Sequence, residues 1–249
     1  MSIINIAVAG CTGKMGQVLC RHLLSHSRYR LVAGIDPAHS GKDLCTIIGT
    51  TETQIKIAHD LASCLSSNKV DAVIDFTSPA AVVANIKTCL EAKTSVLIGT
   101  TGISDKDRAK LDTLAQQNET AALLVPNFAI GAILMMEFAQ KAAQYMKNVE
   151  IIEMHHPQKI DKPSGTALLT RQKIIESMPN SSAASDNDVP VHSVRLPGMV
   201  AHQMVIFGDL GQTLTIRHDS LSRESFMPGI DLGLEQLEGF TGLRIGLKI

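Results

Sequence analysis

The chain of 249 residues contains no tryptophan, and aromatic residues make up only 3% of it. A core without large rings has to be built from Ala, Val, Ile and Leu, which suits a buried parallel sheet covered by helices. Neither sign of charge is in excess, because 23 basic and 24 acidic residues leave a formal net charge of −1. Since no basic block occurs, we expect neither nucleic acid nor an anionic membrane as a partner.

Cysteine is scarce and stops early in the chain, at positions 11, 20, 45, 64 and 89. The count is odd and there is no C-x-x-C pair, which predicts reduced thiols in a cytoplasmic protein rather than a disulfide framework or a zinc site. Residues 1–10 are apolar but lack a basic lead and are too short to span a bilayer. We interpret them as a first strand and not as a signal peptide.

Strand and helix patterns alternate through the first half of the chain. Short apolar runs predict strands over 3–9, 30–35, 70–76, 95–98 and 121–125, and helical spacing predicts helices over 13–24, 80–92 and 105–118. Each strand ends in small or polar residues. The pattern indicates an α/β fold, a Rossmann-like doubly wound parallel sheet that binds ligands beyond the carboxyl ends of its strands.

The pattern changes after residue 128. We predict helices over 131–146 and 164–176, strands over 149–154, 192–196, 201–207 and 212–219, and a polar loop over 177–188. This half is therefore expected to be an α+β domain on a mixed or antiparallel sheet. The final stretch, 230–249, has helical spacing and is expected to return to the first domain.

A glycine-rich turn lies between the first strand and the first helix. It reads Gly10-Cys11-Thr12-Gly13-Lys14-Met15-Gly16. Glycines let backbone amides approach a pyrophosphate at a helix N-terminus, although a tight turn with close helix packing explains the same spacing. Asp36 follows the second strand, about 20 residues beyond this turn, where an acid binds the adenosine ribose. A carboxylate there repels a 2′-phosphate and favours NADH over NADPH, although the positive charge of Lys14 offsets part of that preference. The alternative interpretation is that Asp36 only forms a turn before Pro37.

Small and polar residues end the later strands as well. They are Thr77, Gly99-Thr100-Thr101 and Asn127-Phe128. Such residues leave room for the nicotinamide half of a dinucleotide, and ordinary turn chemistry is the competing interpretation.

The run from Glu153 to Ala167 holds the densest set of reactive side chains. His155 and His156 are neighbours at a strand end, so in a regular strand they point in opposite directions, and we expect no metal there although Glu153 shares a face with His155. The alternative is that both histidines are structural.

A second part of this run favours a ligand site. Pro163 and Ser164 resemble a helix start, so the free amides of Gly165 and Thr166 would face a bound anion. Lys159 adds positive charge, and the hydroxyls of Ser164 and Thr166 add donors. The set predicts a site for substrate carboxylates, with His155 or Lys159 supplying a proton, and gives Lys162 no role. Combined with a dinucleotide fold, it indicates hydride transfer to an unsaturated, carboxylated substrate whose resulting anion needs a proton.

At these residues the sequence resembles the 4-hydroxy-tetrahydrodipicolinate (dihydrodipicolinate) reductase family of lysine and diaminopimelate biosynthesis. The similarity covers nearly the whole chain. Its motifs are Gly10-x-x-Gly13-x-Met15-Gly16, Asp75-Phe76-Thr77, Gly99-Thr100-Thr101-Gly102, Pro126-Asn127-Phe128, Glu153-x-His155-His156-x-x-Lys159-x-Asp161-x-Pro163-Ser164-Gly165-Thr166-Ala167, and the later segment Arg195-Leu196-Pro197-Gly198 to His202 and Phe207.

The resemblance implies a dinucleotide-binding domain of residues 1–126 plus 228–249 and a substrate-binding and oligomerisation domain of residues 127–227. It also implies a homotetramer. It assigns proton chemistry to His155 and Lys159, the substrate carboxylates to His156, Ser164, Gly165 and Thr166, and the cofactor, NADH or NADPH, to the glycine turn, Asp36, Phe76, Thr77, Gly99, Thr100, Thr101 and residues Val125, Pro126, Asn127 and Phe128. Two other functions compete: a dinucleotide-sensing regulator without catalysis, and another amino-acid-pathway dehydrogenase, such as a semialdehyde dehydrogenase with a reactive cysteine.

Overall fold

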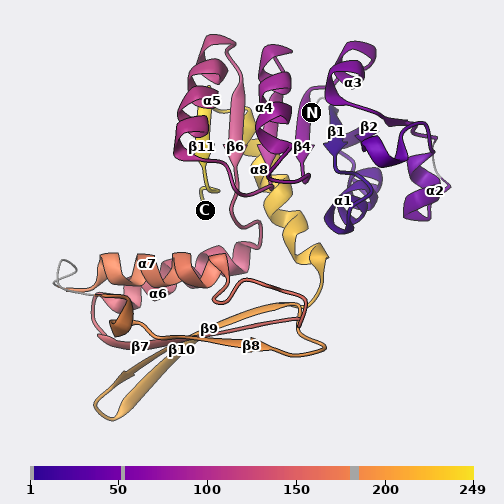
Figure 1. The fold of residues 1–249 in the computed structure, drawn as a ribbon. Helices are drawn as coiled ribbons and strands as arrows, with labels where there is room; N and C mark the ends of the chain where they lie inside the picture. The colour runs from indigo at the N-terminus through magenta and orange to yellow at the C-terminus, as the bar shows by residue number, and fades with distance from the viewer. Residues whose placement is uncertain (1–2, 52–53, 180–184) are drawn as a thin grey trace. The chain divides into compact units, whose positions relative to one another are not determined.

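The computed structural model describes residues 3–51, 54–179 and 185–249 (Figure 1). They form two compact units, one of Met1–Phe128 with Met227–Lys248 and one centred on Ala129–Phe226. Residues 180–184 of the loop expected over 177–188 lie outside the described part, and a 3-10 turn, η3 (Asp186–Asp188), follows them.

A seven-stranded sheet forms the centre of the first unit. In spatial order its strands are β11 (Gly242–Ile245), β6 (Ala121–Leu124), β5 (Ser95–Ile98), β4 (Ala72–Asp75), β1 (Ile4–Ala9), β2 (Tyr29–Ile35) and β3 (Ile57–Ala58). Each neighbouring pair is parallel. The order 3-2-1-4-5-6, which reverses between β1 and β4, is the doubly wound Rossmann topology, so the predicted fold class is confirmed.

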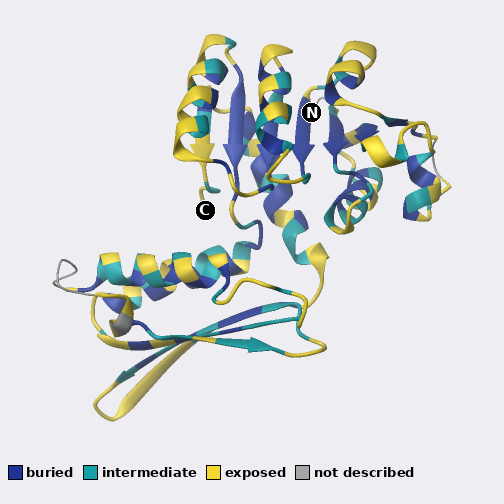
Figure 2. Ribbon diagram, in the orientation of Figure 1, coloured by how far each residue is buried: buried dark blue, intermediate teal, exposed yellow. Residues whose placement is uncertain are grey.

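Helices flank this sheet: α1 (Lys14–Ser25), α2 (Leu44–Ile48), α3 (Leu61–Ser67), α4 (Val82–Glu91), α5 (Asp105–Gln117) and α8 (Met227–Leu237). The central strands are almost wholly buried (Figure 2). One cluster of the core joins strand residues such as Val73 and Val96 to Ile86 and Leu90 of α4 and Leu111 of α5. Small aliphatic side chains thus fill the space between layers, as a chain without tryptophan requires.

Two parts of this unit differ from the prediction. The final stretch is not helical throughout: after α8 the chain forms β11, an edge strand in register with β6 from Gly242 to Ile245. The segment between β2 and β4, for which no element was predicted, holds α2, β3 and α3, which are all seven residues or shorter. Such short elements present too few periods for a sequence pattern to be read.

The second unit is built on a four-stranded sheet ordered β10 (Gln212–Ser220), β9 (Ala201–Asp209), β7 (Asn148–His155) and β8 (Val191–Arg195). The β7–β8 pair is parallel and the others are antiparallel, so the sheet is mixed, as predicted. Two helices, α6 (Ile130–Ala143) and α7 (Gly165–Ser177), share a core with β7 and β9 through residues such as Met135, Ile174, Ile151 and Phe207. A 3-10 turn, η4 (Arg223–Phe226), follows the sheet.

No helix in the described part of the chain is both long enough and apolar enough to cross a bilayer.

Candidate active site

The glycine turn connects β1 directly to α1. Gly10 has a φ of +78°, and a Cβ atom there would lie 2.4 Å from the Phe76 carbonyl oxygen, so only glycine fits. A Cβ at Gly16 would lie 2.1 Å from the Gly10 carbonyl oxygen, which lets α1 start tight against the turn. Gly13 caps α1 without any side-chain hydrogen bond. The backbone around the first turn of this helix is therefore shaped to receive an anion such as a pyrophosphate.

Asp36 lies beside this turn, immediately after β2. Its carboxylate accepts a hydrogen bond from the Ala38 amide at 3.0 Å and another from the Thr12 hydroxyl, and His39 Nδ1 lies 3.5 Å away. Burial alone would raise the pKa of Asp36, but the hydrogen bonds from Thr12, Ala38 and His39 outweigh it and lower this pKa below its ordinary value. Asp36 is therefore a carboxylate at neutral pH, placed as the ribose-binding acid of a dinucleotide fold.

The ends of β4 and β5 are joined by a buried carboxylate to which the motifs assign no role. Asp75 is fully buried and accepts hydrogen bonds from the Thr77 amide (3.0 Å), the Thr77 hydroxyl (2.8 Å), the Thr100 hydroxyl (2.7 Å) and the Asn85 amide (2.8 Å). This network holds two of the predicted cofactor turns in one place. A signal was present, since an acid at the end of an otherwise apolar strand requires partners.

Aromatic rings gather next to the same turns. A Cβ at Gly99 would lie 2.2 Å from the Phe76 ring, and the Phe76 and Phe128 rings are 5.5 Å apart. The structure thus brings together residues from the turns after β1, β4, β5 and β6 within the first unit. Pro126 and Thr101 are exposed beside them.

The second unit holds an open cavity of about 470 Å³ at the end of β7. Its lining residues are His155, His156, Gln158, Lys159, Ile160, Asp161, Val200, Ala201, Arg223 and Phe226. Three predicted site residues, the two histidines and Lys159, therefore border one space. The cavity combines several nitrogen donors with a few apolar contacts, a composition that suits an anionic ring compound.

Both histidines reach the cavity because the strand stops between them. β7 ends at His155, so the alternation of side chains expected for a regular strand does not continue to His156. The prediction that the two side chains point in opposite directions assumed a regular strand, and it does not hold here. His156 Nδ1 is buried and has no hydrogen-bond partner among the described residues, a state that a bound acceptor or donor would relieve.

Glu153 contacts His155 on the Nδ1 side of the imidazole ring. Its Nδ1 lies 2.5 Å from Oε2 of this carboxylate, which is fully buried. Burial lowers the pKa of His155 below its ordinary value, and Lys159 and Arg195 add to that effect, while Glu153 opposes it. At neutral pH the ring is therefore neutral, with its proton on Nδ1 facing the carboxylate.

Lys159 is paired with Asp161, whose carboxylate lies 2.8 Å from Nζ. The ion pair with Lys159 lowers the pKa of Asp161, and a hydrogen bond from the Gly165 amide contributes. Asp161 thus contacts Lys159, although Lys162 is its direct neighbour in the sequence. Lys162 is exposed.

The Ser164-Gly165-Thr166 turn begins α7, as predicted from Pro163 and Ser164. Ser164 is the N-cap, and its hydroxyl accepts a hydrogen bond from the Ala167 amide at 3.2 Å. This bond uses one acceptor lone pair of the hydroxyl, whose O–H can still donate. The three residues do not border the cavity, although Asp161 connects it to the Gly165 amide.

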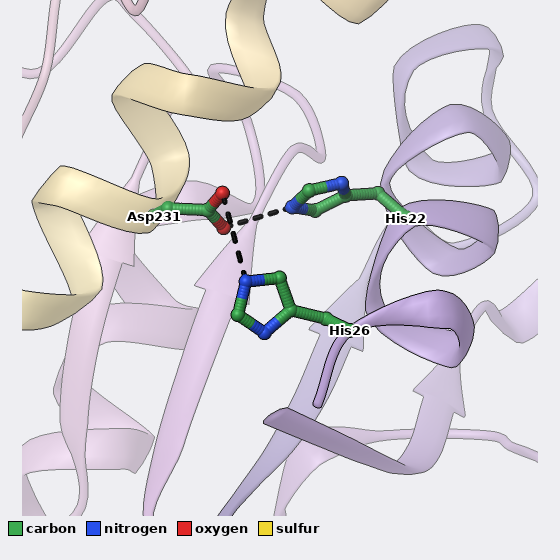
Figure 3. Close-up of side chains that lie close together, drawn as sticks. All are labelled: His22, His26 and Asp231. Atoms are coloured by element: carbon green, nitrogen blue, oxygen red, sulfur yellow. Dashed lines mark hydrogen bonds and ion pairs between the residues drawn. The ribbon is translucent and has the colours of Figure 1, made fainter. Parts of the chain in front are cut away.

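A third group of polar side chains lies elsewhere in the first unit, and no sequence motif marked it. His22 on α1 and His26 at its C-cap face Asp231 on α8 (Figure 3), with Nε2 atoms 2.8 and 3.9 Å from the carboxylate oxygens. The Arg28 amide donates to His26 Nδ1 at 3.1 Å, so the neutral ring carries its proton on Nε2. A metal-bound histidine instead donates from its second nitrogen. The geometry therefore favours a carboxylate bridged by two imidazoles, which ties α8 to α1.

Comparison with known proteins agrees with this arrangement. The family model described as dihydrodipicolinate reductase, N-terminus, matches residues 4–128, and the one described as dihydrodipicolinate reductase, C-terminus, matches residues 131–245. The chain belongs to the dihydrodipicolinate reductase family.

Individual relatives extend over the full length. The 4-hydroxy-tetrahydrodipicolinate reductase of Shouchella clausii is 44% identical, with 98% of each chain covered, and that of Desulfitobacterium hafniense is 43% identical, with 100% of this chain and 98% of the other covered. The structure of dipicolinate-bound dihydrodipicolinate reductase from Paenisporosarcina sp. TG-14 superposes with a TM-score of 0.84 at 38% identity, covering 98% of both chains. An amine dehydrogenase from Mycobacterium smegmatis, at 12% identity and a TM-score of 0.70, shares the fold alone.

In this member of the dihydrodipicolinate reductase family, three further charged residues lie close to the site residues predicted from the sequence. Arg223, on η4, borders the cavity far along the sequence from the histidine–lysine run, and no pattern marked it. Glu153 and Arg195 lie behind the cavity and form a bidentate pair at 2.7 and 2.9 Å. Both belong to the family motifs, so the sequence pointed to each of them, while their pairing required the fold.

Proposed function

We propose that this chain reduces 4-hydroxy-tetrahydrodipicolinate to tetrahydrodipicolinate with NADH or NADPH, as part of lysine and diaminopimelate biosynthesis. The observation that supports it most directly is the convergence of His155, His156 and Lys159 on one cavity, in a chain related over its whole length to named reductases of this substrate. The dipicolinate-bound relative makes a cyclic dicarboxylate the natural ligand class.

The dinucleotide is assigned to residues of the first unit that the fold brings together. The turn Gly10, Cys11, Thr12, Gly13, Lys14, Met15 and Gly16 would receive the pyrophosphate, and Asp36 the adenosine ribose. The turns at Phe76–Thr77, Gly99–Thr101 and Val125–Phe128 would receive the nicotinamide half. Bound there, the reduced nicotinamide supplies a hydride. Because Asp36 is ionised and repels a 2′-phosphate, we propose NADH as the preferred cofactor.

The substrate carboxylates are assigned to the donors of the second unit. We propose His156, with its unpartnered Nδ1, and the Ser164-Gly165-Thr166 turn as their partners, with Lys159 close by. A substrate carboxylate that approaches Lys159 competes with Asp161, which already contacts Nζ at 2.8 Å. This exchange of one carboxylate for another avoids leaving the ammonium group unpaired.

The proton that follows hydride addition is assigned to Lys159. Loss of the 4-hydroxyl of the substrate as water gives a conjugated C=C–C=N system, and hydride addition to this system leaves an anion at the ring that needs a proton. The proton of neutral His155 faces Glu153, and the lowered pKa of the ring makes a second proton scarce at neutral pH. Lys159, which carries ammonium protons and borders the cavity, is the better donor, and His155 offers an acceptor at Nε2.

The competing functions receive less support. A semialdehyde dehydrogenase needs a reactive thiolate, but all five cysteines are buried and free, and burial together with Asp36 raises the pKa of Cys11 to about 12. The division into residues 1–126 plus 228–249 and residues 127–227, a homotetramer and a cytoplasmic location complete the proposal, on the strength of the family resemblance.

A coupled assay tests the function. The preceding enzyme of the pathway generates the substrate in situ, and the loss of reduced-nicotinamide absorbance reports its reduction. Substrate-dependent oxidation of the cofactor is the expected result. Tight binding of dinucleotide without any substrate-dependent oxidation would instead favour a sensor.

A further inference from the structure

Arg195 is the centre of a hydrogen-bond network behind the cavity. It ends β8 and lies in register with His155 on β7. Its side chain is only 6% exposed. A guanidinium group has five N–H donors and no acceptor, so a buried arginine needs five acceptors to be fully paired.

The structure supplies five acceptors. Two are the oxygens of Glu153, at 2.9 Å from Nη1 and 2.7 Å from Nη2. Three are carbonyl oxygens: Val194 at 2.7 Å from Nη1, Asp161 at 2.7 Å from Nη2, and Lys159 at 3.4 Å from Nε. One planar group thereby joins the carboxylate that holds His155 to the loop that carries Lys159.

Glu153 transmits this anchoring to the imidazole. The hydrogen bonds from Arg195, Ser193 and His155 keep the pKa of Glu153 low in spite of its burial. An ionised carboxylate only accepts, so the proton shared at 2.5 Å resides on His155 Nδ1 and the Nε2 lone pair is left for the cavity. Neither Glu153 nor Arg195 borders the cavity, so neither can act on the substrate directly.

We propose that Glu153 and Arg195 are positioning residues for the reaction: Glu153 fixes the tautomer of His155, and Arg195 fixes Glu153 and the Lys159–Asp161 loop in one arrangement. This inference rests on the proposed function for its kinetic consequence. Its structural core, the Nδ1–H tautomer of His155, can be measured without any turnover.

The decisive variant is Glu153→Gln. Arg195 donates to both oxygens of Glu153, and His155 Nδ1 shares only Oε2. With the amide oxygen at the Oε1 position, the NH₂ group takes the Oε2 position, faces His155 and donates to Nδ1, which moves the ring proton to Nε2. A catalytic histidine held in the wrong tautomer loses orders of magnitude in rate, about 10⁴-fold in a serine protease whose triad aspartate is replaced by asparagine. We expect kcat to fall by about 10²-fold or more, with a much smaller change in KM, because the carboxylate-binding groups are untouched.

The same strand offers a matched control. Glu150 contacts His192 at 2.8 Å, a Glu–His pair of the same kind, but both side chains are more than half exposed and neither borders the cavity. Glu150→Gln is expected to leave kcat, KM and the pH profile at their native values.

The pH profile gives a readout that a loss of stability alone would not produce. The charged groups that act on His155 are Glu153, Lys159 and Arg195, while Asp161, His156 and Arg223 share its cavity. Glu153 is the one that raises the pKa of His155, so Glu153→Gln should move the acid limb of kcat/KM to lower pH.

Nitrogen NMR of histidine-labelled protein tests the proposal directly, with His155→Gln used only to assign the signal. The expected result is an Nδ1–H tautomer in the native chain and an Nε2–H tautomer in Glu153→Gln. An Nε2–H tautomer in the native chain overturns the proposal, and so does a folded Glu153→Gln variant with native kcat. If Glu153→Gln does not fold, the native spectrum still decides, and Arg195→Lys, which lacks the planar fork, should retain the tautomer but lose kcat. A native chain that shows the Nδ1–H tautomer yet reduces nothing would sink the proposed function and leave the positioning intact.

Discussion

Removing the charge of Asp36 is the sharpest test of how this chain selects its cofactor. The carboxylate is ionised at neutral pH and held in place by the Ala38 amide and the Thr12 hydroxyl. At about 5 Å and an effective dielectric constant between about 20 and 80, it repels each unit charge of a 2′-phosphate by about 1–3 kcal/mol. In the proposed complex it also accepts hydrogen bonds from the ribose of NADH, and a charged hydrogen bond is worth about 1.5–3 kcal/mol.

Asp36→Ala therefore acts on the two cofactors in opposite directions. The two terms together predict that the ratio of kcat/KM for NADPH to that for NADH rises by about 10²- to 10⁴-fold, since each 1.4 kcal/mol is worth about tenfold. Steady-state assays with both cofactors at one fixed ionic strength measure this ratio, because salt screens the repulsion.

Asp36→Asn separates the two contributions. It removes the charge and keeps an acceptor, so it should relieve the NADPH penalty with a smaller loss toward NADH. His39 Nδ1 lies 3.5 Å from the carboxylate, so the native chain and both variants are compared at one fixed pH. A ratio in Asp36→Ala that stays at its native value would refute the assignment of this carboxylate to the ribose.

The contacts of Lys159, His155 and Asp75 carry three other predictions. Lys159→Ala should lower kcat by about 10²-fold or more, which is the usual contribution of a general acid. Lys162 is exposed, and the control Lys162→Ala should leave turnover near native. Equal losses in the two variants would contradict the assignment of Lys159. Because burial lowers the folded pKa of His155 from 6.5, kcat/KM should persist as the pH falls through 6.5 and decline only below it. The stability linked to this group should be fully present above the unfolded pKa of 6.5 and be lost as the pH falls from 6.5 through the folded pKa; a decline that starts above 6.5 would show the opposite sign. Asp75→Ala, which removes the four hydrogen bonds of a buried carboxylate, should lower the free energy of unfolding by about 3 kcal/mol in denaturant titrations. The control Asp71→Ala, with an exposed bond to the Asn5 amide, should lower it by a much smaller amount.

The sheet of the first unit was predictable where burial imposes a pattern. The strand Ser95–Ile98 is apolar after its first residue and ends in a turn of small residues, and the structure has this strand at the predicted bounds. β11 shows why other strands are missed: it is an edge strand with one neighbour, and its Ile245 is half exposed. A strand buried on one side only, and four residues long, leaves little trace in hydrophobic periodicity.

The residues of the candidate site likewise divide into those that the sequence could predict and those that it could not. His155, His156 and Lys159 lie close in sequence, and their common cavity follows from one strand end and one loop, so local spacing was sufficient to predict them. Arg223 enters the same cavity from a distant 3-10 turn, and Arg195 reaches Glu153 across 42 positions of the chain. Such contacts depend on strand order and register, which single-sequence patterns do not specify.

The second unit contains two ion pairs that differ in burial. The difference explains why one pair is suited to stay together and the other to exchange its partner. Glu153 and Arg195 are almost completely buried, so either charge without the other would be uncompensated in the core, a loss typically worth about 3–5 kcal/mol. Lys159 and Asp161 are 25% and 55% exposed, where an ion pair contributes little and water can replace a partner. The first pair is therefore suited to fix a geometry, and the second to open when a substrate carboxylate arrives. The proposed reaction needs both kinds of pair, because one proton-handling group has to be held still while another is freed. Arg195, which donates to the carbonyl oxygens of Lys159 and Asp161, is placed to hold the backbone during the proposed exchange of side-chain partners.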